Sequence, residues 1–169
     1  RTSLLPGLLD AVAYNASHRN TGVQLFEIGR VFAPGDRGVI TDVEQSVVAG
    51  RVLSGEREHL AAVMAGSEAP AAVELLEVVL GAVGRRVTTL REAEVPGLHP
   101  GRSAEVVVGD GADTALVGAV GEVDPSVLST LNIDERVAWV QLDLDHLARL
   151  PLEVPRHRPV SRLPSTDFD

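Results

Sequence analysis

The sequence predicts an α+β fold in which an antiparallel sheet is flanked by helices. Segments with the alternating apolar pattern of strands follow one another in hairpin order, with only a few helices among them. The glycines provide no nucleotide-binding loop, because the run 118–121 does not match Gly-x-Gly-x-x-Gly and lies inside an expected strand. The chain also contains no lysine, which excludes a P-loop.

Residues 3–17 are expected to form the first helix. Apolar residues recur from Leu5 to Val12 with the period of one helix face. Ser3 can cap this helix, and Pro6 falls in the first turn, where its missing N–H costs nothing.

Three strands are expected next, over 23–32, 45–53 and 59–65. The first alternates in polarity and ends at the turn formed by residues 33–35. The third has an alternative, since its composition also suits a short helix.

The second half of the chain predicts the remaining elements of the sheet and its helices. A stripe of apolar residues followed by Gly84 indicates the first of these helices. The expected elements are a helix over 71–83, a strand over 87–91, a loop over 93–100, paired strands over 103–108 and 115–123, a helix over 125–131 capped by Asp124, a strand over 136–142 with Trp139, and a helical turn over 145–150.

Residues 1–150 are expected to form one domain and residues 151–169 a linker. A chain of 169 residues suits one domain of ordinary size. After Leu150 the sequence becomes rich in proline and arginine, which is typical of a linker. The basic patch over 155–159 is interpreted as a solvated hinge, with an RNA contact as the alternative.

Composition excludes several classes of function. A net charge of −9 argues against binding of a phosphate backbone, and 3% aromatic residues leave little for stacking on bases. The absence of cysteine excludes a disulfide scaffold and cysteine nucleophiles and is compatible with the cytoplasm. No apolar run is long enough to span a membrane, so a membrane partner is not expected.

Asp143, Asp145 and His146 form the most metal-like cluster in the sequence. Carboxylates two residues apart on a strand share a face, and the imidazole can add a nitrogen ligand. The interpretation we favour is an N-cap at a solvated helix start. We therefore expect neither a metal site nor catalytic residues here.

Two other groups of residues are candidate sites. The run 99–103 can form an anion-binding turn that uses Arg102 and a backbone N–H, although a Pro-Gly dipeptide also makes an ordinary turn. Ser17, His18 and His59 belong to no nucleophile elbow, because the chain contains no Gly-x-Ser-x-Gly. These histidines are interpreted as surface or hydrogen-bonded residues.

Six segments resemble, in order, the β chain of bacterial phenylalanyl-tRNA synthetase. One of them is Leu25-Phe26-Glu27-Ile28-Gly29-Arg30-Val31-Phe32 and another is His99-Pro100-Gly101-Arg102-Ser103-Ala104. The others are 1–10, 120–125, 142–144 and 161–165. The resemblance covers nearly the whole chain and points to the catalytic-like module of that subunit, a relative of the class II synthetase core.

The resemblance implies that this core has lost its catalytic site. Class II cores bind ATP through an arginine in the second signature and through glycines and an arginine in the third. Arg30 lies where the first arginine is expected, whereas Gln141 and Asp143 stand at the two glycines and His146 at the second arginine. We therefore expect no bound cofactor, and only Arg30 and Arg102 remain as candidate ligand-binding residues.

What the resemblance implies about function is assembly rather than chemistry. The family's α chain joins phenylalanine to tRNA with ATP and magnesium, in a cytoplasmic heterotetramer of two α and two β subunits. The chain is then a non-catalytic part of this ATP-dependent ligase that supports assembly with the α subunit, while tRNA is bound through other modules. It resembles a fragment, with a C-terminal module expected beyond residue 169.

Two other functions are compatible with such a core. A degenerate synthetase paralogue can still bind a nucleotide or amino acid as a regulatory module, and Arg30 and Arg102 facing one cleft would favour it. A large exposed apolar patch would favour the assembly role instead. A free-standing ligase is a third option, and the substitutions at Gln141, Asp143 and His146 count against it.

Overall fold

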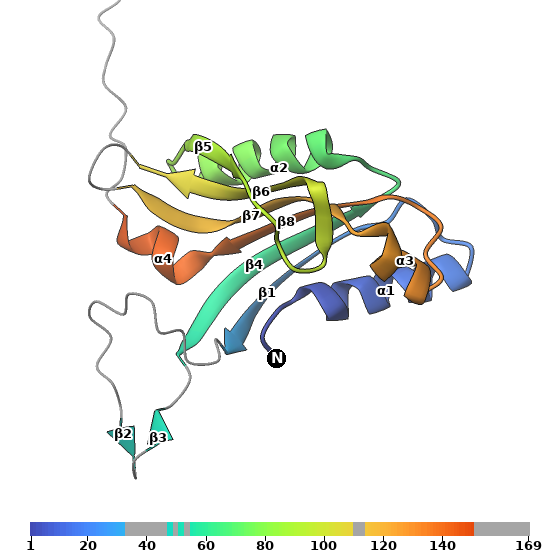
Figure 1. The fold of residues 1–169 in the computed structure, drawn as a ribbon, viewed down its shortest axis with the longest axis horizontal. Helices are drawn as coiled ribbons and strands as arrows, with labels where there is room; N and C mark the ends of the chain where they lie inside the picture. The colour runs from blue at the N-terminus through green and yellow to red at the C-terminus, as the bar shows by residue number, and fades with distance from the viewer. Residues whose placement is uncertain (33–46, 49–50, 53–54, 110–113, 151–169) are drawn as a thin grey trace, which may run out of the picture.

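The computed structural model describes residues 1–32, 47–48, 51–52, 55–109 and 114–150 (Figure 1). In chain order the elements are α1 (Leu5–Ser17), β1 (Gln24–Phe32), β2 (Val47–Val48), β3 (Arg51–Val52), β4 (Glu56–Ala65), α2 (Ala69–Ala82), β5 (Val87–Glu92), β6 (Leu98–Val108), β7 (Ala115–Val123), α3 (Pro125–Thr130), β8 (Val137–Asp143) and α4 (Leu144–Arg149). The expected linker, 151–169, and its basic patch lie outside the described residues.

A six-stranded antiparallel sheet forms the centre of the fold. Its strand order is β1-β4-β8-β7-β6-β5, so β1 and β5 are the two edges. Helix α1 lies along one face of the sheet and α2 along the other (Figure 1). The expected α+β class with an antiparallel sheet is therefore confirmed.

Two apolar clusters, one on each face, hold the helices to the sheet. On the α1 face, Leu8 and Leu9 pack with Val63 and Trp139, and α3 adds Leu128. These side chains lie in segments that the sequence predicted to be helices or strands. Burial of such side chains stabilises by roughly 1.5–3 kcal/mol each, so this cluster fixes α1 over β4 and β8.

The second cluster lies beneath α2. Leu76 and Leu80, one helical turn apart, pack against Val120 and Val140 of the central strands, and Leu147 of α4 joins them. Because α2 lies over β7 and β8, it leaves the edge strand β1 uncovered on that face. No helix among the described residues is both long and apolar enough to cross a membrane.

Local signals placed several element ends correctly. The Asp124 side chain caps α3 by accepting a hydrogen bond from Ser126 N at 2.7 Å. The Ser3 hydroxyl accepts from Leu5 N at 3.1 Å, although the N-cap residue itself is Leu4. Residues 59–65 lie in strand β4, so the helical alternative for them is wrong.

Two expectations are corrected by the structure. Where one strand was expected over 45–53, the described residues form the two short strands β2 and β3, which pair antiparallel. The expected loop over 93–100 is too long, because β6 already begins at Leu98, which pairs with Val123. Pro100 is tolerated inside β6 because the register with β7 shifts between Leu98 and Ser103.

Candidate functional site

Asp143, at the end of β8, caps helix α4. Its Oδ1 accepts a hydrogen bond from His146 N at 2.8 Å, and the residue is buried. The neighbouring Asp145 is exposed, and its Oδ2 accepts from Glu58 N at 2.8 Å. The N-cap interpretation of these residues is therefore confirmed, and the two carboxylates are engaged by different backbone groups. Within the described parts of the chain, no group of three or more acidic, histidine or cysteine residues is arranged to hold a metal ion.

The same carboxylate joins a polar cluster on the α1 face of the sheet. Asp143 Oδ2 lies 3.0 Å from the Arg57 guanidinium and 3.8 Å from His59 Nε2. On its other side, His59 Nδ1 lies 2.9 Å from Gln141 Nε2. Because an amide nitrogen donates, His59 accepts there with Nδ1, and its proton then resides on Nε2, which faces Asp143.

Burial lowers the pKa of His59, and the nearby Arg57 charge lowers it further, while Asp143 and Asp145 act in the opposite direction. The neutral imidazole is thus the favoured form at neutral pH. Gln141 and Asp143 stand at the expected positions of the two class II glycines, and both are engaged. Gln141 contacts His59, and Asp143 accepts a hydrogen bond from the backbone at the start of α4.

Arg30 lies on the other face of the sheet. In the register of the strands, Gly29 pairs with His59 and His59 with Asp143, and directly paired residues share a face. Arg30, one residue further along β1, must therefore point to the opposite face. There its guanidinium lies 3.1 Å from the Glu56 carboxylate, and both side chains are exposed.

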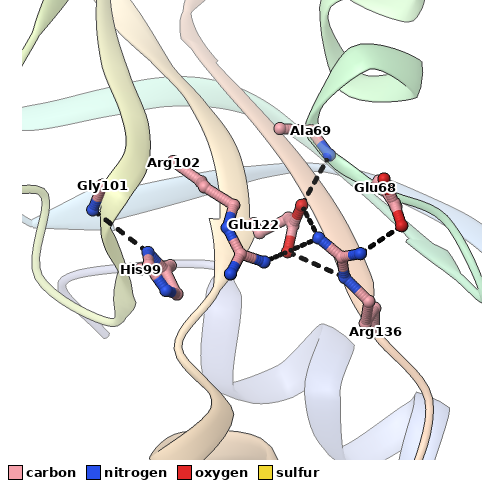
Figure 2. A network of polar contacts seen from close by, with 7 residues as sticks. All are labelled: Glu68, Ala69, His99, Gly101, Arg102, Glu122 and Arg136. Carbon is pink, nitrogen blue, oxygen red and sulfur yellow. Dashed lines mark hydrogen bonds and ion pairs between the residues drawn. The ribbon is translucent and has the colours of Figure 1, made fainter.

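Arg102 belongs to a different cluster, centred on the buried carboxylate of Glu122 (Figure 2). Arg102 Nη1 donates to Glu122 Oε2 at 2.8 Å, and Arg136 Nη2 donates to both carboxylate oxygens, at 2.6 and 2.8 Å. The carboxylate also accepts from Ala69 N at 3.0 Å, at the start of α2. Arg136 forms a further ion pair with Glu68.

The environment of Glu122 favours its ionised form. Burial alone raises the pKa of the carboxyl, but the hydrogen bonds from Arg136, Ala69 and Arg102 outweigh burial and lower it. The carboxylate in turn raises the pKa of Arg136. Glu122 thereby links the N-terminus of α2 to strands β6 and β7 and to Arg136, next to β8, which is a structural role.

The sequence did not indicate Glu122 as a central residue. Its partners come from the first residue of α2, from β6 and from the segment before β8, and no local spacing relates them. The one available signal was a glutamate within a strand of otherwise small and apolar residues. Such a side chain is buried only when it is paired.

The run 99–103, which was a candidate anion-binding turn with an ordinary turn as the favoured interpretation, is part of strand β6. Gly101 N donates to His99 Nδ1 at 3.0 Å, and Arg102 is engaged with Glu122 (Figure 2). Arg102 borders a hollow of about 740 Å³ formed mainly by α3 and the segment before β8. Arg30 borders a separate hollow of about 270 Å³. The two arginines therefore do not face one cleft.

The exposed face of β1 carries large apolar side chains. Phe26, Ile28 and Phe32 are 73%, 53% and 42% exposed. Strict alternation along β1 places all three on one face, with Arg30 between the last two. We call Phe26, Ile28 and Phe32 the β1 surface.

The fold defined by this sheet and its helices is that of a class II aminoacyl-tRNA synthetase core. The structure of Desulfitobacterium hafniense PylSc, a pyrrolysyl tRNA synthetase, matches 88% of this chain and 48% of that chain with a TM-score of 0.62. Sequence identity over the match is 16%, so the likeness concerns the fold alone.

Within that class, the chain belongs to the family of the phenylalanyl tRNA synthetase beta chain CLM domain, whose model matches residues 1–144. Among curated proteins, it is 35% identical to the phenylalanine–tRNA ligase beta subunit of Lactiplantibacillus plantarum and 32% identical to that of Moorella thermoacetica. Both matches cover 100% of this chain but 21% and 20% of those proteins. The chain thus spans about a fifth of the length of these relatives, and the expected resemblance is confirmed.

Proposed function

We propose that this module is non-catalytic and supports assembly of the β chain with the catalytic α chain of phenylalanine–tRNA ligase. In this proposal ATP and magnesium act in the α chain, other modules of the β chain contact tRNA, and the assembled α2β2 enzyme works in the cytoplasm. Family membership supplies the enzyme to which the module belongs. The polar cluster at Gln141 and Asp143 supports the absence of a nucleotide site.

The observation that carries the proposal is the β1 surface. Exposed apolar side chains gathered on one face of an edge strand mark interaction sites more often than scattered single ones do. Arg30 and Arg102 facing one cleft would favour the regulatory alternative, whereas the two residues border separate hollows. The assembly role is therefore the function that the geometry supports better.

Light scattering on a sizing column tests the proposal directly. The matching α chain is co-expressed with the full-length β chain and, separately, with a β chain lacking residues 1–150. We expect one defined heterotetramer from the first pair and none from the second. Normal assembly by the shortened β chain would remove the assembly role from this module.

A further inference from the structure

The turn after α1 and the turn before α2 meet at one end of the sheet, although the two helices lie on opposite faces (Figure 1). A Cβ added at Gly66, which precedes α2, would lie 3.9 Å from the Cα of Gly22, which follows α1. Beside this contact, Ala65 N donates to Val23 O at 2.9 Å. The segment that enters β8 passes the same place, because Gly66 N donates to Arg136 O at 2.8 Å. Three segments that are far apart in the sequence therefore lie together here.

Glu135 connects the segment before β8 to the end of α1. Its Oε2 accepts a hydrogen bond from Gly22 N at 2.9 Å. The turn that contains Gly22 is tied to α1, because Asn20 N donates to Asn15 O at 3.0 Å and Asn20 Nδ2 donates to Asn15 Oδ1 at 2.8 Å. Gly66 leaves room for the carboxylate, since a Cβ there would lie 3.2 Å from Glu135 Oε2. The φ of +75° at Gly66 also favours glycine.

Arg136, the next residue, is engaged with the start of α2 (Figure 2). Its guanidinium forms an ion pair with Glu68, the N-cap residue of α2. The same guanidinium donates to the Glu122 carboxylate from Nε at 3.1 Å and from Nη2 at 2.6 Å. Glu122 in turn accepts from the N–H of Ala69, the first residue of α2, at 3.0 Å. The start of α2 therefore depends on Arg136 both directly and through the position of Glu122.

The two sets of contacts share one short piece of backbone, because Glu135 and Arg136 are consecutive. Neighbouring Cα atoms stay about 3.8 Å apart, so a shift of this segment that breaks the contact with Gly22 also displaces the guanidinium from Glu122. Side chains that belong to one network of hydrogen bonds and ion pairs affect stability jointly and not independently. The contacts at the end of α1 and those at the start of α2 are therefore expected to form and break together.

We propose that Glu135 and Arg136 form a latch that couples the end of α1 to the start of α2. Release of either side chain loosens both helix ends, so that a change on one face of the sheet reaches the other face. This coupling goes beyond the assembly role proposed above and does not depend on it.

Hydrogen–deuterium exchange in the full-length β chain tests the latch. Glu135→Ala removes the acceptor for Gly22 N, and Arg136→Met removes the guanidinium but keeps an apolar stem. We expect each variant to raise the exchange rate by at least about threefold both in residues 15–23, at the end of α1, and in residues 67–77, at the start of α2. An increase confined to the helix end nearest the substituted residue, or no increase at either end, would overturn the inference.

Two matched controls break an ion pair of the same kind elsewhere. Glu105→Ala and Arg91→Met each remove one partner of a pair between strands β5 and β6, and we expect the exchange of both helix ends to stay within about 1.5-fold of the wild type. Helix α4, at the opposite end of β8, is the internal reference. An equal increase in α4 in the latch variants would indicate a general loss of stability and would overturn the coupling.

The double variant Glu135→Ala/Arg136→Met distinguishes one latch from two independent contacts. If either substitution already releases the latch, the second adds little, and we expect exchange at both helix ends within about twofold of the more affected single variant. Increases that multiply would show that the two side chains act independently and would overturn the inference. None of these outcomes bears on assembly with the α chain, so the latch and the proposed function fail separately.

Discussion

Arg30 and Gln141 lie on opposite faces of the same sheet, as the register of β1, β4 and β8 requires. In a nucleotide-binding core, residues at these two signature positions would have to approach one ligand. Here the sheet separates them, and each is engaged on its own face, Arg30 with Glu56 and Gln141 with His59.

The chain alone is expected to show no saturable binding of ATP. Gln141 and Asp143 hold contacts to His59, Arg57 and the start of α4, and the Asp143 carboxylate would repel phosphate groups. Isothermal titration calorimetry checks this, after a cooperative unfolding transition has shown that the chain is folded. Saturable heat with a stoichiometry near one would contradict the prediction and favour the regulatory alternative.

Arg30→Glu is expected to act on folding or on α-chain association and not on turnover. The Arg30–Glu56 pair is exposed, so its loss costs only ~0–1 kcal/mol of the free energy of unfolding. The measurement is aminoacylation per assembled heterotetramer, with the assembled fraction determined on a sizing column. A variant that assembles normally but no longer aminoacylates tRNA would place Arg30 in the chemistry.

Glu122→Gln is expected to lower the free energy of unfolding by about 2 kcal/mol, the order of a broken set of charged hydrogen bonds. The substitution keeps the size of the side chain but removes the charge that Arg102 and Arg136 share. Urea unfolding measures the change. Glu105→Gln is the matched control, because its pair with the exposed Arg91 lies at the surface and its loss should cost at most about 1 kcal/mol. Equal losses of the free energy of unfolding for the two substitutions would show that the Glu122 cluster stabilises the fold no more than a surface ion pair does.

Sequence reasoning succeeded where the signal was local. The periodicity of residues from Leu5 to Val12 predicted α1, and Asp124 followed by proline predicted α3, because caps and helix faces depend on neighbours within a few residues. The expected loop over 93–100 was wrong at Leu98. A nearby proline indicated a loop there, but Leu98 pairs with the distant Val123 and begins a strand. Sequence reasoning identified Asp143 as an N-cap for the same local reason.

The larger failure concerned side chains that meet only after folding. Arg102 was noticed as a candidate, but its partner Glu122 was not, because β6 and β7 must pair before the two side chains meet. The β1 surface was likewise not visible as a patch. Its residues alternate within one strand, and only the position of α2 over β7 and β8 shows that one face of β1 is left exposed.

Stability is expected to depend on His59 at mildly acidic pH. Folding lowers the pKa of this imidazole, mainly through burial, from its ordinary value of 6.5. The unfolded chain therefore takes up a proton at a higher pH than the folded chain does. The free energy of unfolding contributed by this difference is fully present above pH 6.5 and is lost as the pH falls toward the folded pKa.

His59→Gln should remove this part of the pH dependence. We expect the wild-type chain to lose more of its free energy of unfolding between pH 7.5 and pH 5.5 than the variant does, as measured by urea unfolding at each pH. His18→Gln is the matched control, because it makes the same substitution at an exposed histidine at the end of α1. The comparison separates His59 from the carboxylates, since Glu122, whose pKa is lowered by folding, loses its contribution only at more acidic pH. If His59→Gln kept the full wild-type slope, the imidazole would have to be as easily protonated in the folded chain as in the unfolded one, which is incompatible with its burial between Gln141 and Asp143.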